Sequence, residues 1–236
     1  MIAENTNYGN DIALRLSPKS GKIIVEEHKA DGAVSFKEIS PIDLYYILNE
    51  SYSSNDAVST GFLPEHCLSM TIGKTHKYLV LWNPELYADM TYGGTEYIHF
   101  PIPRLVVGVR MLDNGKVVGC YLGVVTDEKP TPDTVMYHYP FSNVHTDSSV
   151  CIGNNVLPRY KKQSALIHFP RYLLSIPDND DMYFPKNNKP GLNHKELMEL
   201  LKDKDPAYYY SDILIPNGKT LKEFIGGIYG ESDDDS

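Results

Sequence analysis

The first forty residues contain two runs of alternating apolar and polar positions, with a turn between them. Ile12, Leu14 and Leu16 occupy every second position, as in a strand that buries one face. The sequence SPKSG at 17–21 is typical of a turn, and a second extended run covers residues 23–25. This pattern predicts an opening β-hairpin.

A helix signal follows this hairpin. Ser40 precedes Pro41, and Asp43 stands three residues after the serine, which is the arrangement expected at a helix N-terminus. Apolar residues then recur at helical spacing, namely Leu44, Tyr45, Ile47 and Leu48. We therefore predict a short helix at about residues 41–50.

The clearest β signal lies in the middle of the chain. Residues 104–112 and 116–125 are rich in valine and are joined by Asp-Asn-Gly at 113–115. An Asn-Gly pair supplies the positive φ angles of a tight hairpin turn. An earlier strand is expected at 78–82, where Asn83-Pro84 ends it. These segments predict consecutive antiparallel strands.

The second half of the chain is less regular. Residues 135–158 follow a proline-rich connection and show no sustained period, so an ordered loop is expected there. Later, Asn193 and Glu196 have the spacing of a capping box and predict a helix at about 194–203. Strands first and a helix afterwards are typical of an α+β fold with an antiparallel meander.

Composition and charge exclude several functions. The formal net charge of -9 argues against broad binding to nucleic acid, which needs clustered lysine and arginine. The balance of 42% hydrophobic and 22% charged residues is that of a soluble globular protein. No apolar run approaches the ~20 residues that span a bilayer, and the N-terminus lacks the pattern of a secretion signal. We therefore expect a cytoplasmic protein.

The three cysteines form neither a disulfide framework nor a metal motif. Cys67, Cys120 and Cys151 have no CxxC spacing, so we expect free thiols and no zinc site. Cys67 and Cys120 lie in apolar contexts and are interpreted as packing residues. From the residues alone, Cys151 between two apolar neighbours is more often a core residue than a nucleophile.

Other polar residues in the same loop leave their roles open. Asn143 taken alone is a turn residue, because asparagine tolerates irregular backbone. His138, His145 and Asp147 could form an acid–base group with Cys151, or they could simply be solvated.

The segment Asn143 to Gly153, NVHTDSSVCIG, resembles the active site of ubiquitin-conjugating enzymes. In that family an asparagine lies eight residues before the catalytic cysteine, and a small apolar residue stands on each side of the cysteine. Asn143 and Cys151 have this spacing, with Val150 and Ile152 as the flanks. The chain is more similar still to family D of the prokaryotic conjugating-like proteins, which includes protein B of the PRTRC plasmid systems. That similarity extends to Phe-Pro-Ile-Pro at 100–103 and to LIPNGKTL at 214–221.

Two departures from the eukaryotic pattern stand out. Phe141-Ser142 replaces the His-Pro that precedes the asparagine, so only Asn143 carries over from that tripeptide. No tryptophan follows the cysteine, since Trp82 is the single tryptophan of the chain.

The resemblance implies a fold and a domain organisation. It implies a ubiquitin-conjugating (UBC-like) domain over about 60–225. The residue pattern itself predicts a smaller β-rich extension with a short helix before this domain, at 1–59, and an acidic disordered tail after it, at 226–236.

The resemblance also implies a reaction and its partners. Cys151 would accept a ubiquitin-like protein as a thioester from a ThiF-like activating enzyme and pass it to an amine. A JAB-type metalloprotease would belong to the same pathway, with no cofactor and no nucleic-acid or membrane partner. Asn143 would stabilise the oxyanion of the transfer step. His145 is a further candidate for assisting Cys151, not from the resemblance but as a member of the acid–base group considered above.

Two rival interpretations remain. A noncatalytic module of the same fold would only dock the ubiquitin-like protein, and a buried Cys151 would favour it. A Cys-His hydrolase would pair Cys151 with His138 or His145, and it would need a ring nitrogen within about 4 Å of the sulfur.

Overall fold

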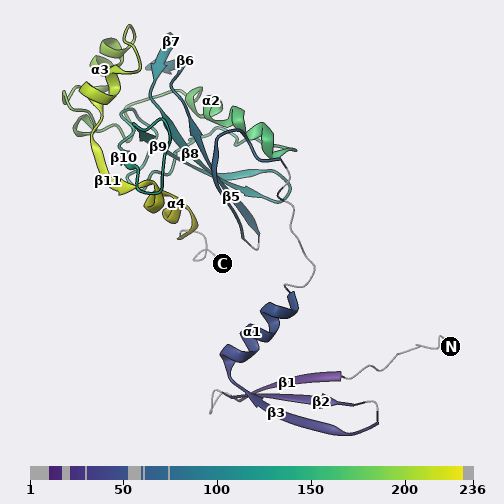
Figure 1. The fold of residues 1–236 in the computed structure, drawn as a ribbon. Coiled ribbons are helices and arrows are strands. Elements are labelled where there is room, and N and C mark those ends of the chain that lie inside the picture. The colour runs from purple at the N-terminus through teal and green to yellow at the C-terminus, as the bar shows by residue number, and fades with distance from the viewer. Residues whose placement is uncertain are drawn as a thin grey trace, which may run out of the picture. The chain divides into compact units, whose positions relative to one another are not determined.

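The computed structural model describes residues 11–17, 22–29, 31–52, 60, 62–73 and 75–230. Two compact units make up the chain, Met1–Ser59 and Thr60–Ser236 (Figure 1). Each has its own antiparallel β-sheet, so the protein is of mixed α and β class. No helix in the described part of the chain has the length and apolar character to cross a membrane.

The N-terminal unit is a three-stranded sheet followed by a helix. Its strands β1 (Asp11–Ser17), β2 (Lys22–His28) and β3 (Val34–Ile39) lie in that order. The β1–β2 pairing confirms the predicted hairpin, and residues 18–21 of its turn lie outside the described residues. Helix α1 (Pro41–Tyr52) begins as predicted, because the Asp43 N–H donates to Ser40 Oγ and the Ser40 N–H donates to the Asp43 carboxylate.

The second unit is centred on a six-stranded antiparallel sheet. Its strands lie in the order β11-β10-β9-β8-β5-β4. Strand β5 contains the predicted strand at 78–82, and β8 and β9 form the predicted valine-rich pair. The bounds are β4 (Cys67–Ile72), β5 (His76–Asn83), β8 (Leu105–Leu112), β9 (Val117–Val125), β10 (Val135–Tyr137) and β11 (Pro216–Thr220).

The remaining elements cover this sheet. They are the hairpin of β6 (Leu86–Tyr92) and β7 (Thr95–Ile102), and the helices α2 (Phe169–Leu174), α3 (His194–Leu201) and α4 (Leu221–Gly230). Short 3-10 helices cover Gln163–His168 and Pro185–Asn187, and a π-helical turn covers Tyr209–Ile213.

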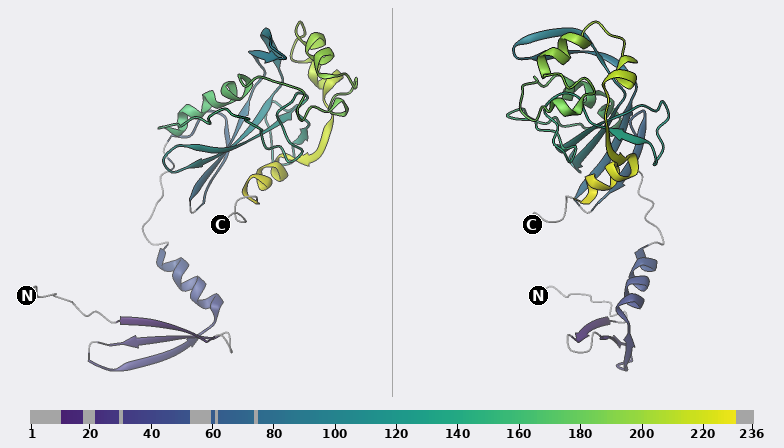
Figure 2. Two further views of the ribbon diagram at one scale, coloured as in Figure 1. Left: turned by 180° about the vertical axis from the view of Figure 1, so that it is seen from behind. Right: turned by 90° about the vertical axis from the view of Figure 1, so that its left-hand side faces the viewer.

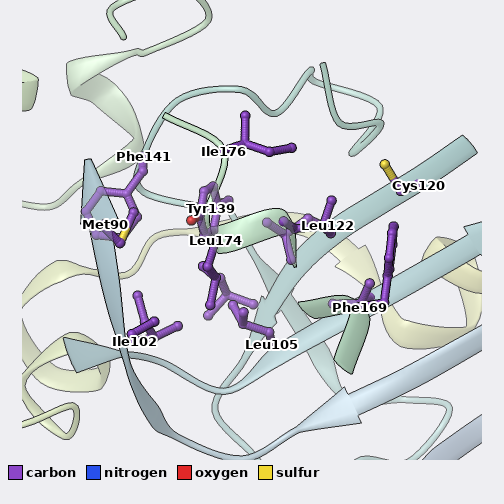
Figure 3. Close-up of a cluster of buried hydrophobic side chains, with 14 of the residues drawn as sticks. Met90, Ile102, Leu105, Cys120, Leu122, Tyr139, Phe141, Phe169, Leu174 and Ile176 are labelled. Carbon is purple, nitrogen blue, oxygen red and sulfur yellow. The ribbon is translucent and has the colours of Figure 1, made fainter. Parts of the chain in front are cut away.

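Alternation along the strands divides the core into two layers. Leu105 and Val107 of β8 pack on the face that also meets β6, β7, α2 and α3, whereas Val106 packs on the face that meets α4. The ribbon views accordingly show α2 and α4 on opposite sides of the sheet (Figures 1 and 2). In the larger layer, Phe169 and Leu174 lie near Leu105 (Figure 3). The central strands β8 and β9 are therefore buried on both faces.

The turn between β8 and β9 differs from the predicted one. Gly115 has a φ of 82°, but Asn114 is not among the residues with positive φ. The Gly115 N–H donates to the Leu112 carbonyl at 2.9 Å, and the Leu112 N–H donates to the Lys116 carbonyl at 2.9 Å. This is the pattern of a longer hairpin loop in which glycine alone takes the left-handed conformation.

Helix caps near the C-terminus confirm one prediction and correct another. The Glu196 N–H donates to the Asn193 side chain at 3.0 Å, so α3 begins at the predicted capping box. Residues 226–230, however, are not part of a disordered tail but form the end of α4. The Glu223 N–H donates to Thr220 Oγ1 at 3.3 Å, and Leu221, Phe224 and Ile228 are buried at helical spacing. Residues 231–236 lie outside the described residues.

The β6–β7 hairpin was not predicted. Its turn contains Gly93 and Gly94, with φ angles of 56° and 81°. Alternate residues Ala88 and Met90 of β6 are buried. A Gly-Gly pair between alternating runs is a recognised hairpin signal, so this hairpin could have been predicted from the sequence.

Replacing Gly115 tests how firmly the β8–β9 turn is held. A β-carbon at this position would lie 2.0 Å from the Tyr160 carbonyl oxygen, and Gly115 also has a positive φ. Gly94 has nearly the same φ, but a β-carbon there would have nothing within 4 Å. We expect Gly94→Ala to lower the free energy of unfolding by about 1–2 kcal/mol, the cost of the left-handed conformation. Gly115→Ala should cost about 1–3 kcal/mol more, because the backbone must shift. Urea denaturation measures both, and equal losses would contradict the close approach.

Candidate functional site

The loop that carries Cys151 lies along one edge of β9. Residues 124 and 125 of β9 pair with β10, and further along the strand the same edge meets the loop. The Val150 N–H donates to the Cys120 carbonyl, and the Leu122 N–H donates to the Ser148 carbonyl, both at 2.9 Å. After β10 the loop has only isolated bridges up to residue 158, as predicted, and these bonds to β9 hold it in place.

Asn143 and Cys151 face each other across a small hairpin. The Cys151 N–H donates to the Asn143 carbonyl at 2.8 Å, and Val144 pairs with Val150. The turn is closed by the His145 N–H, which donates to the Ser149 carbonyl at 2.9 Å. The eight-residue spacing is therefore the length of this hairpin, which brings two of the predicted site residues together.

The side chain of Asn143 is held by the loop that follows α2. Its Nδ2 donates to the Pro177 carbonyl at 3.2 Å and to Asp178 Oδ1 at 3.0 Å. Its backbone φ of 63° lies in the left-handed region, which asparagine tolerates better than most residues. Because an amide nitrogen carries two hydrogens, both donors are in use in this arrangement.

Asp178 is a site residue that no sequence signal marks. Only 6% of its surface is exposed, and its Oδ1 also accepts a hydrogen bond from Ser142 Oγ at 2.8 Å. Its Oδ2 is buried without a hydrogen-bond partner among the described residues. Burial raises the pKa of Asp178 to about 7, against a smaller opposing effect of the Ser142 hydrogen bond. In sequence it resembles its neighbours Asp180 and Asp181, and loop carboxylates are ordinarily exposed.

Cys151 opens into a cleft of about 630 Å³. The residue is half-buried, and its neighbours Val150 and Ile152 pack against the core. A volume in this range is comparable to that of small-ligand clefts. Cys151 therefore borders a space that can admit a reacting group. The cleft is lined by Asn143, Cys151, Ile152, Gly153, Asn155, Ile176, Pro177, Asn179, Asp181 and Met182.

The other two cysteines pack in or against the core, which confirms their interpretation as packing residues. Cys120 is buried (Figure 3), and burial raises the pKa of its thiol to about 12. Cys67 is half-buried, so it is more accessible than expected. Burial raises the pKa of Cys67, and the bond from its thiol to the Ser69 carbonyl, at 3.4 Å, opposes that rise.

The two histidines do not share the cleft of Cys151. His138 and His145 both line a separate cavity of about 260 Å³ that does not include Cys151. Asp147 accepts hydrogen bonds from the Ser149 N–H at 2.8 Å and from Ser149 Oγ at 2.7 Å, so it caps the hairpin turn. Burial tends to raise the pKa of Asp147, but these bonds and the charge of His145 hold it below its ordinary value. The described part of the chain holds no group of three or more His, Cys, Asp or Glu residues that could bind a metal.

A protein-family comparison places this site in context. The model of prokaryotic E2 family D matches residues 44–172, which is more than half of the chain and includes both Asn143 and Cys151. The chain belongs to prokaryotic E2 family D. As an E2-like protein, it is related to ubiquitin-like conjugation, in which E2 proteins in general interact with ubiquitin-like proteins and activating enzymes. No curated protein and no solved structure matches the chain.

The buried carboxyl of this family D protein predicts a pH dependence of stability. Because folding raises the pKa of Asp178 from 3.8 to about 7, the folded protein keeps a proton that the unfolded chain loses above about pH 4. The free energy of unfolding should therefore fall as the pH rises through this window and level off above about pH 7. Asp178→Asn should remove a few kcal/mol of that fall, at about 1.4 kcal/mol for each unit of pKa.

Chemical denaturation of both proteins between about pH 4 and pH 8 measures this difference. Asp181→Asn is the matched control, because Asp181 is an exposed carboxylate in the same loop. The prediction is contradicted if Asp178→Asn follows the wild-type pH profile.

Proposed function

We propose that this family D protein accepts a ubiquitin-like protein as a thioester on Cys151 from a ThiF-like activating enzyme and transfers it to an amine. We further propose that the unit from 60 to 225 has the ubiquitin-conjugating fold. One observation carries the proposal: Cys151 and Asn143 meet across a hairpin at a ligand-sized cleft, inside the segment that the family model matches. The antiparallel meander with helices on both faces supports the fold.

The chemistry needs little beyond an accessible sulfur. In loading, the Cys151 thiolate attacks the thioester carbonyl on the activating enzyme, a new C–S bond forms, and the thiolate of the activating enzyme leaves. In discharge, an amine attacks the thioester carbon, the C–N bond forms, the C–S bond breaks, and the amine loses a proton to solvent. The Cys151 thiolate is regenerated. Sulfur serves as both nucleophile and leaving group, so neither step calls for a metal.

Asn143 has two compatible roles in this proposal. In the resting protein its amide holds the loop after α2 through Pro177 and Asp178. During discharge the longer of these bonds, to the Pro177 carbonyl, would be released so that one N–H can donate to the oxyanion. A donor aimed at developing charge in this way stabilises a transition state by about 3 kcal/mol. His145 lines the other cavity and has no part in the proposed transfer.

Loading at Cys151 is the direct test of the proposed function. With its cognate activating enzyme, ubiquitin-like protein and ATP, the wild type should form an adduct that dithiothreitol removes, because excess thiol attacks a thioester. Cys151→Ser should form an oxyester that survives reductant but not hydroxide, and Cys151→Ala should form no adduct. Cys67→Ala and Cys120→Ala are the matched controls and should load like the wild type. Gel electrophoresis with and without reductant measures each.

Two outcomes would count against this assignment. If Cys151→Ala still loads, the nucleophile lies elsewhere. If the activating enzyme becomes charged but no variant accepts the ubiquitin-like protein, the protein is a docking module rather than a transferase.

A variant pair separates the two roles of Asn143. Asn143→Ala should load at nearly the wild-type rate but discharge to free lysine about a hundredfold more slowly, because the donor acts only as the tetrahedral centre forms. Ser142→Ala is the matched control, since it removes a bond to Asp178 and leaves the Asn143 amide intact. Single-turnover assays measure both steps. Equal slowing of discharge in the two variants would show that Asn143 acts only by holding the loop.

A further inference from the structure

The cavity lined by His138 and His145 includes a lysine and no acidic residue, whereas the protein as a whole is negatively charged. The chain carries a net charge of -9, but neither aspartate nor glutamate lines this cavity of about 260 Å³. Lys186 lines it together with the two histidines. The Lys186 ammonium also lies 5.5 Å from the centre of the ring of Phe184, another lining residue.

Several residues that line this cavity carry hydrogen-bond donors that make no bond within the described part of the chain. Asn217 Oδ1 accepts a bond from the Lys219 N–H at 2.9 Å, so the NH₂ of Asn217 remains available. In the part of the chain that the structure describes, the side chains of Thr146, Asn187 and Lys186 make no hydrogen bond. All four donors belong to residues that line the cavity. A ligand with several acceptor oxygens would satisfy them together.

The electrostatic environment of His138 agrees with a positive field. His138 is half-buried, and burial lowers the pKa of its imidazole. The charges of Lys186 and Lys219 lower that pKa further, because a second cation nearby disfavours a protonated ring. Lys219 therefore adds positive potential at His138, although it does not line the cavity.

We propose that this cavity binds an oxyanion, either a phosphate or a carboxylate group, through Lys186, His138, His145 and the free donors of Thr146, Asn187 and Asn217. Hydrogen bonds from charged donors to such oxygens are shorter and stronger than neutral ones, which favours this class of ligand. Two sources share the chemistry, namely free phosphate and an acidic side chain of a bound protein. Anion binding here does not depend on Cys151 accepting a thioester, so the two can fail separately.

The test is a titration of the full chain followed by amide NMR, at constant ionic strength set with sodium chloride. One arm adds sodium phosphate, and the other adds an acetylated, amidated Glu-Glu dipeptide. We expect saturable shifts of the Thr146 and Asn187 resonances. Lys186→Gln should weaken the binding roughly tenfold, because it removes the strongest charge-assisted bond. Asn217→Asp should weaken it at least as much, since it replaces a donor with a negative charge.

Lys195→Gln is the matched control, because Lys195 is an exposed lysine of α3 that does not line the cavity. It should bind like the wild type. Saturation by phosphate alone identifies a free anion as the ligand, and saturation by the dipeptide alone identifies an acidic side chain. The proposal is overturned if neither ligand saturates, or if Lys195→Gln weakens binding as much as Lys186→Gln does.

Discussion

The hydrogen bond from the Cys151 N–H to the Asn143 carbonyl fixes the geometry on which the candidate site depends. It closes a hairpin that β9 holds through Cys120 and Leu122, so a strand of the central sheet sets the position of the loop. Val144 and Val150 pack against the core from the two arms of this hairpin. A one-residue slip in the pairing would turn these valines outward and the cysteine inward, and their burial therefore selects the register that faces the thiol to the cleft.

A buried polar cluster joins this hairpin to the other wall of the cleft. Ser142 and Asn143 both donate to Asp178, whose own N–H donates to the Thr91 carbonyl at 2.7 Å at the end of β6. Burying a carboxyl without satisfying both oxygens is costly, and here Oδ2 is left without a partner among the described residues. An apolar residue would avoid that cost but could not hold the Asn143 amide. The cluster thus lowers the stability of the fold but fixes the position of Asn143.

Local signals in the sequence predicted much of the fold, whereas contacts between distant segments could not be predicted from such signals. The cap at Ser40, the capping box of Asn193 and Glu196, and the hairpin of β8 and β9 all depend on residues within a few positions of one another. The pairing of β10 with β11 joins residues about eighty positions apart, and no local pattern specifies it. Residues 226–230, the second half of α4, were assigned to a tail because the short apolar stripe of this helix precedes an acidic end.

The candidate site, like the fold, was predicted where its residues are close in sequence and was missed where only folding brings them together. The spacing of Asn143 and Cys151 was informative because one small hairpin spans it. His145 was expected to assist Cys151 because it is close in sequence, but it lies in the turn of that hairpin and lines a different cavity. Asp178 meets Asn143 only through folding, and its importance comes from burial, which a run of loop carboxylates does not reveal.

One hairpin contributes residues to both cavities, so the proposed anion site and the cleft share a stretch of backbone. Val144 and Ser148 line the cavity of the histidines, while Asn143 and Cys151, at the ends of the same hairpin, line the cleft. A ligand that binds the closed hairpin more tightly than an opened one stabilises the closed form, in which Cys151 and Asn143 face each other. Linkage is reciprocal, so an acyl group on Cys151 that favours the closed hairpin must strengthen anion binding by the same factor. A ligand bound at His145, outside the cleft, would then act on the thiol through the backbone that His145 shares with Cys151.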